Sequence, residues 1–131
     1  MSYLWIFIGG GLGSIARFAA SGLAARCFGE TFPWGTMLVN ITGSFVIGFF
    51  VAGTGPDGRW LVSPRFSEFF IYGICGGYTT FSSFSRDTLK LAQGGEWLKA
   101  GGNVVLSVVL CLAAVWLGYV LASQLNRMKG S

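Results

Sequence analysis

The residues best suited to contact an ion lie in one short polar stretch, GGYTTFSSFS at residues 76–85. Phe81 and Phe84 are three residues apart and therefore share a face of any helix that contains them. An aromatic ring has a negative face and a positive edge, so two rings presented edge-on can hold a small anion without a formal charge. Ser82 and Ser83 lie between the rings and add hydroxyl donors. The alternative is that the rings only pack and the hydroxyls bond to preceding carbonyls.

The same stretch contains two adjacent glycines, Gly76 and Gly77, within a segment that is otherwise apolar. Glycine is unfavourable inside a helix, so this pair predicts a helix break at this point. Carbonyls freed at such a break can coordinate a cation, and the candidates are those around Gly76 and Thr79. Backbone that leaves the helix at membrane depth is tolerated only where it is buried in protein or lines a water-filled path. The stretch is therefore the best candidate for the working part of an ion channel.

Two further polar side chains lie inside apolar segments. Asn40 carries an amide NH2 group, which is a good donor to an anion; its alternative role is a hydrogen bond between helices. Arg17 is a charge in the middle of the first apolar segment, which is rare and costs about 2.5 kcal/mol or more on insertion scales. It faces a wet vestibule, caps helix carbonyls, or is a structural arginine that extends toward the interface.

The composition of the chain indicates which class of element holds these residues. Of 131 residues, 53% are hydrophobic and only 11% are charged, and the mean hydropathy is +0.63. A soluble domain carries about 25% charged residues, so the deficit indicates an integral membrane protein. The length is too small for a membrane domain together with a soluble one. We therefore expect a single, all-α transmembrane domain over residues 1–131.

Four apolar segments approach or exceed the roughly 20 residues that cross a hydrocarbon core of about 30 Å. Short loops that contain glycine, proline and acidic residues separate these segments. The sequence therefore predicts four transmembrane helices per chain, with the third broken near its middle, at residues 4–28, 34–53, 66–92 and 98–125.

Small residues recur four apart in two of these segments. Gly9 and Gly13 form one such pair, and Gly73 and Gly77 form another. This spacing lets helix backbones approach closely. With 21 glycines in the chain, matches also arise by chance, so the pattern predicts close packing without identifying the partner helix.

Basic residues are distributed evenly over the two sides of this four-helix topology. With Arg17 left aside as intramembrane, each side has four. If the N-terminus is cytoplasmic, the inside set is Arg59, Arg65, Arg127 and Lys129, and the outside set is Arg26, Arg86, Lys90 and Lys99. Orientation follows an excess of Lys and Arg on the cytoplasmic side, and here there is none. The balance predicts insertion in both orientations and an antiparallel homodimer; the alternative is a single topology set by a minor asymmetry.

Several function classes are disfavoured. The chain has no histidine and no recognisable catalytic motif, so we expect no enzyme. Its three cysteines have no metal-ligand spacing, and its nine basic residues are scattered rather than clustered, so we expect no nucleic-acid partner. A proton-coupled multidrug exporter needs a carboxylate within the membrane. The one acidic residue well inside a predicted helix, Asp87, lies late in the third.

Three pieces of the sequence resemble the Fluc (CrcB) family of fluoride channels, and the resemblance covers essentially the whole chain. The pieces are GSIARF at 13–18, GTMLVN at 35–40 and GGYTTFSSFS at 76–85, and the last is highly specific. Membership of this family implies an antiparallel, dual-topology homodimer in the lipid bilayer. It also implies two fluoride pores and a structural sodium ion at the dimer centre, with no organic cofactor.

The resemblance also assigns roles to individual positions. Phe81 and Phe84 would present ring edges to fluoride, and Asn40 would donate its amide to the ion. The other implied roles are hydroxyl donors for Ser82 and Ser83, a polar track on the fourth helix for Ser107, a vestibule position for Arg17, and sodium coordination by the backbone carbonyls of Gly76 and Thr79 from both subunits.

Four positions depart from the usual pattern of that family. Ser83 stands where threonine is common, Asp87 where glutamate is usual, and Tyr78 where leucine is common. Cys111 stands where a serine is expected, and a thiol is a weak donor. These changes bear on conduction rate and fine selectivity rather than on identity.

The sequence thus predicts a channel in a bacterial inner membrane that lets fluoride leave the cell passively, down its electrochemical gradient. Fluoride is small and strongly hydrated, so a selective pore must replace its water with donors that bind it weakly enough to let it leave. The alternatives are a small dual-topology multidrug or cation transporter and a membrane assembly subunit without a transport role.

Overall fold

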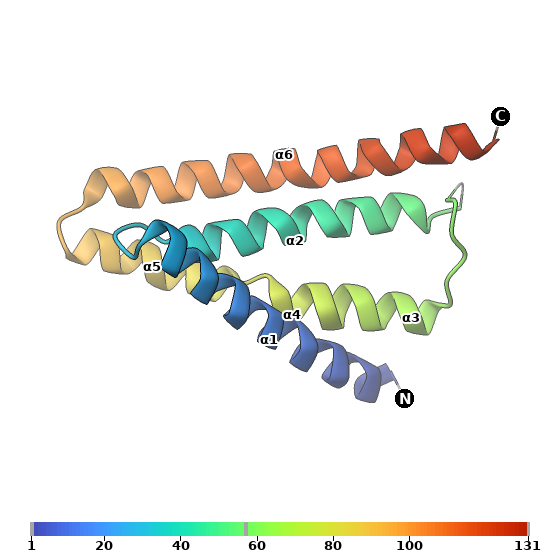
Figure 1. The fold of residues 1–131 in the computed structure, drawn as a ribbon, viewed down its shortest axis with the longest axis horizontal. Coiled ribbons are helices and arrows are strands. Elements are labelled where there is room, and N and C mark those ends of the chain that lie inside the picture. The colour runs from blue at the N-terminus through green and yellow to red at the C-terminus, as the bar shows by residue number, and fades with distance from the viewer. Residues whose placement is uncertain (1, 57, 131) are drawn as a thin grey trace.

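The computed structural model describes residues 2–56 and 58–130, which are all-helical with no strand (Figure 1). The side chain of Lys129 lies outside the described part. The helices are α1 (Ser2–Phe28), α2 (Trp34–Gly53), α3 (Pro64–Glu68), η1 (Phe69–Cys75), α4 (Gly76–Tyr78), α5 (Phe81–Gln93) and α6 (Trp97–Gly130), of which η1 is a π-helix. The all-α class is confirmed, and α2 has the predicted bounds.

The helices form two arms that meet at one end and diverge toward the other (Figure 1). One arm is α2 packed along α6. Glycines allow this contact, because a Cβ at Gly48 would overlap the Val115 carbonyl and one at Gly118 would overlap that of Phe45. The other arm is α1 lying across α3, η1 and α4. Both ends of the chain lie where the arms diverge.

The predicted glycine pairs pack against each other. A Cβ at Gly9 would lie 2.7 Å from the Phe69 carbonyl oxygen, and one at Gly73 would lie 3.0 Å from the Gly9 Cα. A Cβ at Gly77 would lie 2.5 Å from the Gly10 carbonyl oxygen. The prediction of close packing is therefore confirmed, and its partners are α1 and the η1–α4 segment.

The predicted break is present, but its predicted position was wrong. Gly76 is helical, with φ −63° and ψ −36°, and α4 continues through Gly77 to Tyr78. The chain leaves the helix at Thr79, with φ −83° and ψ 158°, and Thr80, with φ −154° and ψ 118°. The reason is that Gly77 provides room for α1, whereas Thr80 starts a new helix by capping it.

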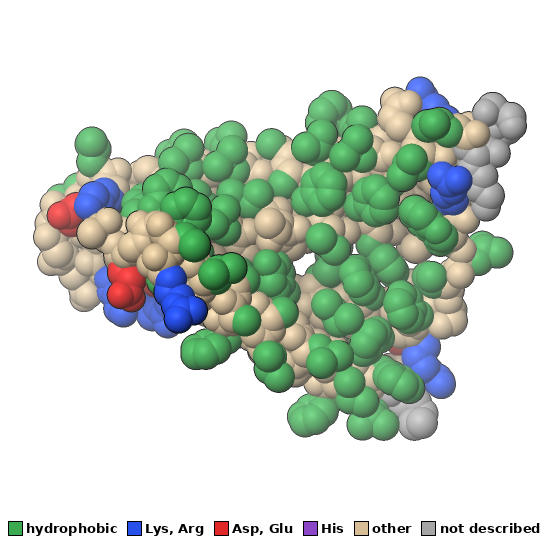
Figure 2. Space-filling view, in the orientation of Figure 1, with side chains coloured by type: hydrophobic (Ala, Val, Ile, Leu, Met, Phe, Trp, Pro, Cys, Tyr) green, Lys and Arg blue, Asp and Glu red, His purple; other side chains and the backbone are tan. Residues whose placement is uncertain are grey.

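Within the described residues, three helices are long and apolar enough to cross a membrane: α1, α2 and α6, the last over Trp97–Met128. The predicted third transmembrane helix is divided by the break, and its second part, α5, has only 13 residues. Four crossings per chain therefore remain a prediction. Figure 2 shows hydrophobic side chains along the visible face and charged side chains toward its ends, the surface expected of an integral membrane protein.

Candidate functional site

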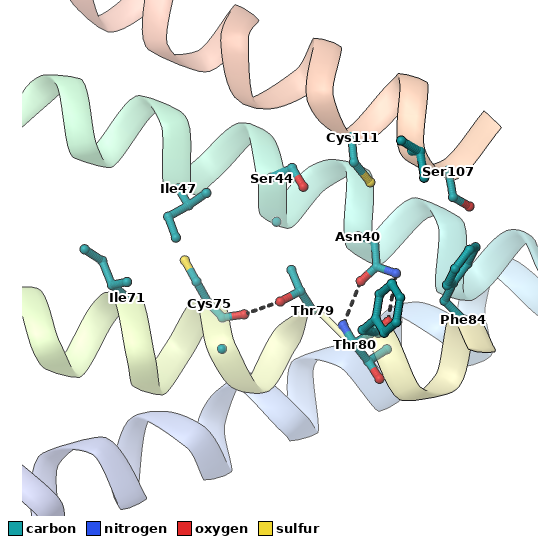
Figure 3. A pocket seen from close by; sticks show the side chains of 14 residues that line it. Asn40, Ser44, Ile47, Ile71, Cys75, Thr79, Thr80, Phe84, Ser107 and Cys111 are labelled. Atoms are coloured by element: carbon teal, nitrogen blue, oxygen red, sulfur yellow. Dashed lines mark hydrogen bonds between the residues drawn. The ribbon is translucent and has the colours of Figure 1, made fainter. Parts of the chain in front are cut away.

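A cavity of about 330 Å³ lies between α2, η1, the α4–α5 junction and α6 (Figure 3). None of the described residues that line it is charged. The cavity brings together six of the predicted site residues: Asn40, Gly76, Thr79, Phe81, Phe84 and Ser107. The other three, Arg17, Ser82 and Ser83, are not part of its lining.

Asn40 closes the helix break with two hydrogen bonds to one residue. Its Nδ2 donates to the Thr80 carbonyl oxygen at 3.0 Å, and its Oδ1 accepts from the Thr80 backbone N–H at 2.7 Å. Figure 3 shows both bonds crossing from α2 to the junction. Thr80 has lost its helical partners, and the carboxamide replaces them. The sequence-based alternative of a hydrogen bond between helices is thus present.

These two hydrogen bonds between Asn40 and the Thr80 backbone, called the clasp below, leave Asn40 with capacity to bind a ligand. A carboxamide has two N–H donors and two acceptor lone pairs, and the Thr80 backbone occupies one of each. Asn40 lines the cavity, so its second N–H is the donor that remains for an anion there. Because the clasp fixes the plane of the amide, the direction of this N–H is fixed as well.

The start of α5 is organised by Thr80. Its Oγ1 accepts from the Ser83 backbone N–H at 3.1 Å, an N-cap that satisfies one of the donors a helix start leaves free. The Ser82 hydroxyl lies 3.3 Å from the same Oγ1. Ser82 and Ser83 therefore support the junction and do not reach the cavity, whereas Ser85 donates to the Phe81 carbonyl at 3.0 Å.

Phe81 and Phe84 lie in the first turn of α5, both against the cavity. Their ring centroids are 5.4 Å apart, and the ring planes are inclined at 45°. The Phe81 side chain is 78% exposed in the single chain, so most of this large apolar ring is not covered by the rest of the protein. Both rings therefore lie at the cavity, and an edge-on approach to an anion there remains a prediction.

Gly76 and Thr79 reach the cavity from the two ends of α4. Thr79 is anchored by the Cys75 carbonyl, which accepts from its backbone N–H at 3.0 Å and its Oγ1 at 2.9 Å. The extended ψ of Thr79 turns its own carbonyl away from the axis of α4. Backbone oxygens at such a junction fit a hard cation, which prefers carbonyl ligands.

Arg17 lies on α1, away from the cavity. Gly13, one turn earlier, packs against Tyr78 at the end of α4. The Nε of Arg17 is buried and has no hydrogen-bond partner among the described residues. An unpaired buried N–H is costly, so this Nε is a site where a water molecule or another group would be stabilised.

A protein-family model and several relatives match almost the whole chain, and all of them indicate the same family. The family model described as CrcB-like protein, Camphor Resistance (CrcB), matches residues 4–119. The chain belongs to the CrcB-like family. A protein of Opitutus terrae is 59% identical over 129 residues, 98% of each chain, and one of Methylocella silvestris is 55% identical over 131 residues, 100% of each. One of Rhodospirillum rubrum is 56% identical over 127 residues, 97% of this chain and 98% of that protein. Each of the three is named fluoride-specific ion channel FluC.

Tyr78 and Asp87 tie α2 to the broken segment. The Tyr78 hydroxyl lies 2.9 Å from Thr42 Oγ1. Asp87 Oδ2 accepts from Thr36 Oγ1 at 2.8 Å, and its Oδ1 pairs with Arg86 at 3.2 Å. Together with the Asn40 clasp, these contacts attach both sides of the break to one helix.

The sequence analysis missed a polar network behind the cavity wall. Asn103 on α6 is 1% exposed and connects Ser107 to Thr88 on α5. Ser44, one turn after Asn40, and Cys111, one turn after Ser107, also line the cavity. Asn103 could have been found from its four-residue spacing with Ser107 and Cys111, which places all three on one face of a helix.

Proposed function

We propose that this chain is a fluoride-selective ion channel of the bacterial inner membrane, through which fluoride leaves the cell passively. The single observation that carries the proposal is the uncharged cavity at the helix break, which Asn40, Phe81, Phe84 and Ser107 line together. The relatives named fluoride-specific ion channel support the same function.

The cavity suits the chemistry of fluoride. A fixed cation would bind this small anion too tightly to let it leave, whereas neutral donors and ring edges replace its water at lower strength. The donors are held by the fold before the ion arrives, because the clasp to Thr80 fixes Asn40. In our proposal Phe81, Phe84 and Asn40 contact fluoride, Ser107 continues the path along α6, and Arg17 attracts anions near its entrance.

An antiparallel homodimer would complete the pores. The Thr80–Ser82 hydroxyl pair and the Phe81 ring are exposed in the single chain, beside the break in the backbone. Polar backbone and side chains at membrane depth do not face lipid, so a second protein surface must cover them. The divergent arms also leave a cleft of about 820 Å³, lined by α2, the loop residues 54 and 58–62, and Phe70 of η1, which offers room for part of such a surface.

The even distribution of basic residues supports opposite orientations of the two copies. In such a dimer the junctions of the two chains would face each other. We propose that the carbonyls of Gly76 and Thr79 from both chains hold a sodium ion there. The ion would supply positive charge between the two breaks, and its role would be structural.

The exporter alternative receives no support from the cavity, whose described lining has no carboxylate. Asp87 is instead held by Thr36 and Arg86.

Growth of a bacterium that lacks its own fluoride channel tests the proposal. Expression of the chain is expected to restore growth in fluoride, and Phe81→Ile is expected not to restore it at equal membrane abundance. Failure of the wild-type chain to restore growth, with the protein present in the membrane, would count against the proposal.

A further inference from the structure

If the cavity conducts fluoride, as proposed above, the direction in which the Ser107 hydroxyl points its hydrogen decides whether Ser107 can bind the ion. Ser107 is 5% exposed and lines the cavity. A hydroxyl helps an anion only when its hydrogen points at the ion, because its oxygen lone pairs repel negative charge. Here Ser107 Oγ donates to Asn103 Oδ1, so its hydrogen points away from the cavity.

Asn103 controls this direction without contacting the cavity. It is 1% exposed and is not among the residues that line the cavity. Its Nδ2 donates to Thr88 Oγ1 at 2.9 Å, and Thr88 Oγ1 donates to the Phe84 carbonyl at 2.8 Å. The network therefore runs from the carbonyl of one cavity residue, Phe84, to the hydroxyl of another, Ser107, and Asn103 is its centre.

The link between Ser107 and Asn103 is the weak one. Its Oγ–Oδ1 distance is 3.2 Å, which is long for a hydroxyl donor, whose preferred distance is about 2.7–2.8 Å. The terminal torsion of an asparagine is broad and close to two-fold, so the carboxamide can exchange the positions of its oxygen and nitrogen. Because the two orientations of the Asn103 carboxamide occupy nearly the same space, Asn103 can either accept a hydrogen bond from Ser107 or donate one to it.

We propose that Asn103 is a positioning residue of the ion path: when its carboxamide turns over, Ser107 releases its hydrogen to the anion. In the turned state Nδ2 donates to Ser107 Oγ, and Oδ1 accepts from the Thr88 hydroxyl. The three hydrogen bonds present in the structure are replaced by two within the network and one to the ion. The Phe84 carbonyl loses the Thr88 hydroxyl but keeps its place in the backbone ladder of α5. The exchange therefore leaves no buried polar group without a partner.

Removing the carboxamide has a predictable result. In Asn103→Leu, which keeps a similar size, no side-chain donor holds the Ser107 oxygen. The hydroxyl then bonds to the residue 103 carbonyl, four residues earlier on α6, as serine does in helices. Ser107 is again unable to donate to the ion, so this variant and Ser107→Ala should have the same defect.

The test is fluoride efflux from liposomes for the wild type, both single variants and the double variant. Each single substitution is expected to slow efflux about tenfold, the effect of one hydrogen bond to a charged partner. The double variant should be no slower than Ser107→Ala alone, because both changes remove the same hydrogen bond. Asn103→Gln, which keeps a carboxamide, should remain within about threefold of wild type, since one donor and one acceptor remain available.

Thr88→Val is the matched control on the other side of the network. It removes one hydrogen bond from each orientation of the Asn103 carboxamide, from Nδ2 to Thr88 Oγ1 as observed and from the Thr88 hydroxyl to Oδ1 when turned, so the balance between them and the efflux are expected to change less than in Asn103→Leu. All variants must match the wild type in helicity and in elution by size exclusion. Wild-type efflux by Asn103→Leu, or a double variant about a hundredfold slower, would overturn the inference alone, because Asn103 would then act independently of Ser107. No efflux by the wild type would overturn the proposed function as well.

Discussion

Replacing Asn40 by leucine, which has a similar size and no polar atoms, tests how the helix break is held together. The substitution removes both bonds to Thr80 and leaves its N–H and its carbonyl without partners. The two bonds are part-buried, so each is worth about 0.5–1.5 kcal/mol net and the junction should lose about 1–3 kcal/mol. The loss should be local, because α2 keeps its contact with α6 through Gly48 and Gly118.

Amide hydrogen exchange at Thr80, followed by mass spectrometry on a peptide that spans the break, measures this loss. A decrease of about 2 kcal/mol in the free energy of local opening accelerates exchange about thirtyfold, and larger losses accelerate it further. Ser44→Ala is the matched control, since Ser44 lies one turn along the same helix, lines the same cavity and has no hydrogen-bond partner among the described residues. Unchanged exchange in Asn40→Leu would refute the clasp.

Three further predictions follow from the fold and the proposed pore. Phe81→Ile should greatly reduce fluoride flux while dimers still form, because the ring edge is lost and the apolar volume is largely kept; equal flux in a liposome assay would remove Phe81 from the path. Exchange of sodium for a large organic cation should weaken the dimer, and a dimer fraction independent of sodium in a subunit-exchange assay would contradict the central cation site. Gly118→Ala should destabilise the chain by about 1–3 kcal/mol, since its Cβ would overlap the Phe45 carbonyl, whereas Gly102→Ala on the same helix has open space and should not; thermal unfolding in detergent distinguishes the two.

Much of the fold follows from hydropathy and turn residues. The bounds of α2 are those predicted, and α1 begins two residues earlier than predicted and ends at the predicted residue. The position of the break in the predicted third transmembrane helix did not follow from the sequence. Gly76 and Gly77 predict a break on propensity alone, but propensity does not reveal that Gly77 is needed for contact with α1. The tertiary contact overrides the local preference and moves the break to Thr79 and Thr80.

Residue type predicted Asn40, Phe81 and Phe84 as site residues, and the family resemblance added Ser107. Asn40, Phe81, Phe84 and Ser107 line one cavity, although their sequence separation is large. The role of Asn40 at the break was not predictable, because its bonds are to backbone atoms of Thr80, which carry no sequence signature. For the same reason the position of Ser82 and Ser83 at the cap of α5 was not predictable, and their role as pore hydroxyls stays a prediction.

The hydrogen-bond partners of Asn103 could not be predicted for a different reason. A buried amide in a membrane helix is visible in the sequence, but its partners, Thr88 and Ser107, are fixed only by the packing of α5 against α6. The dimer and its sodium ion depend on a second copy and stay predictions.

Efflux of fluoride and chloride from liposomes that hold the purified protein, followed with two ion-selective electrodes in parallel, tests the central claim most directly. The account predicts rapid release of fluoride and no release of chloride above that of protein-free vesicles. Equal release of both ions, or no fluoride release from protein shown to be folded and dimeric, would contradict it.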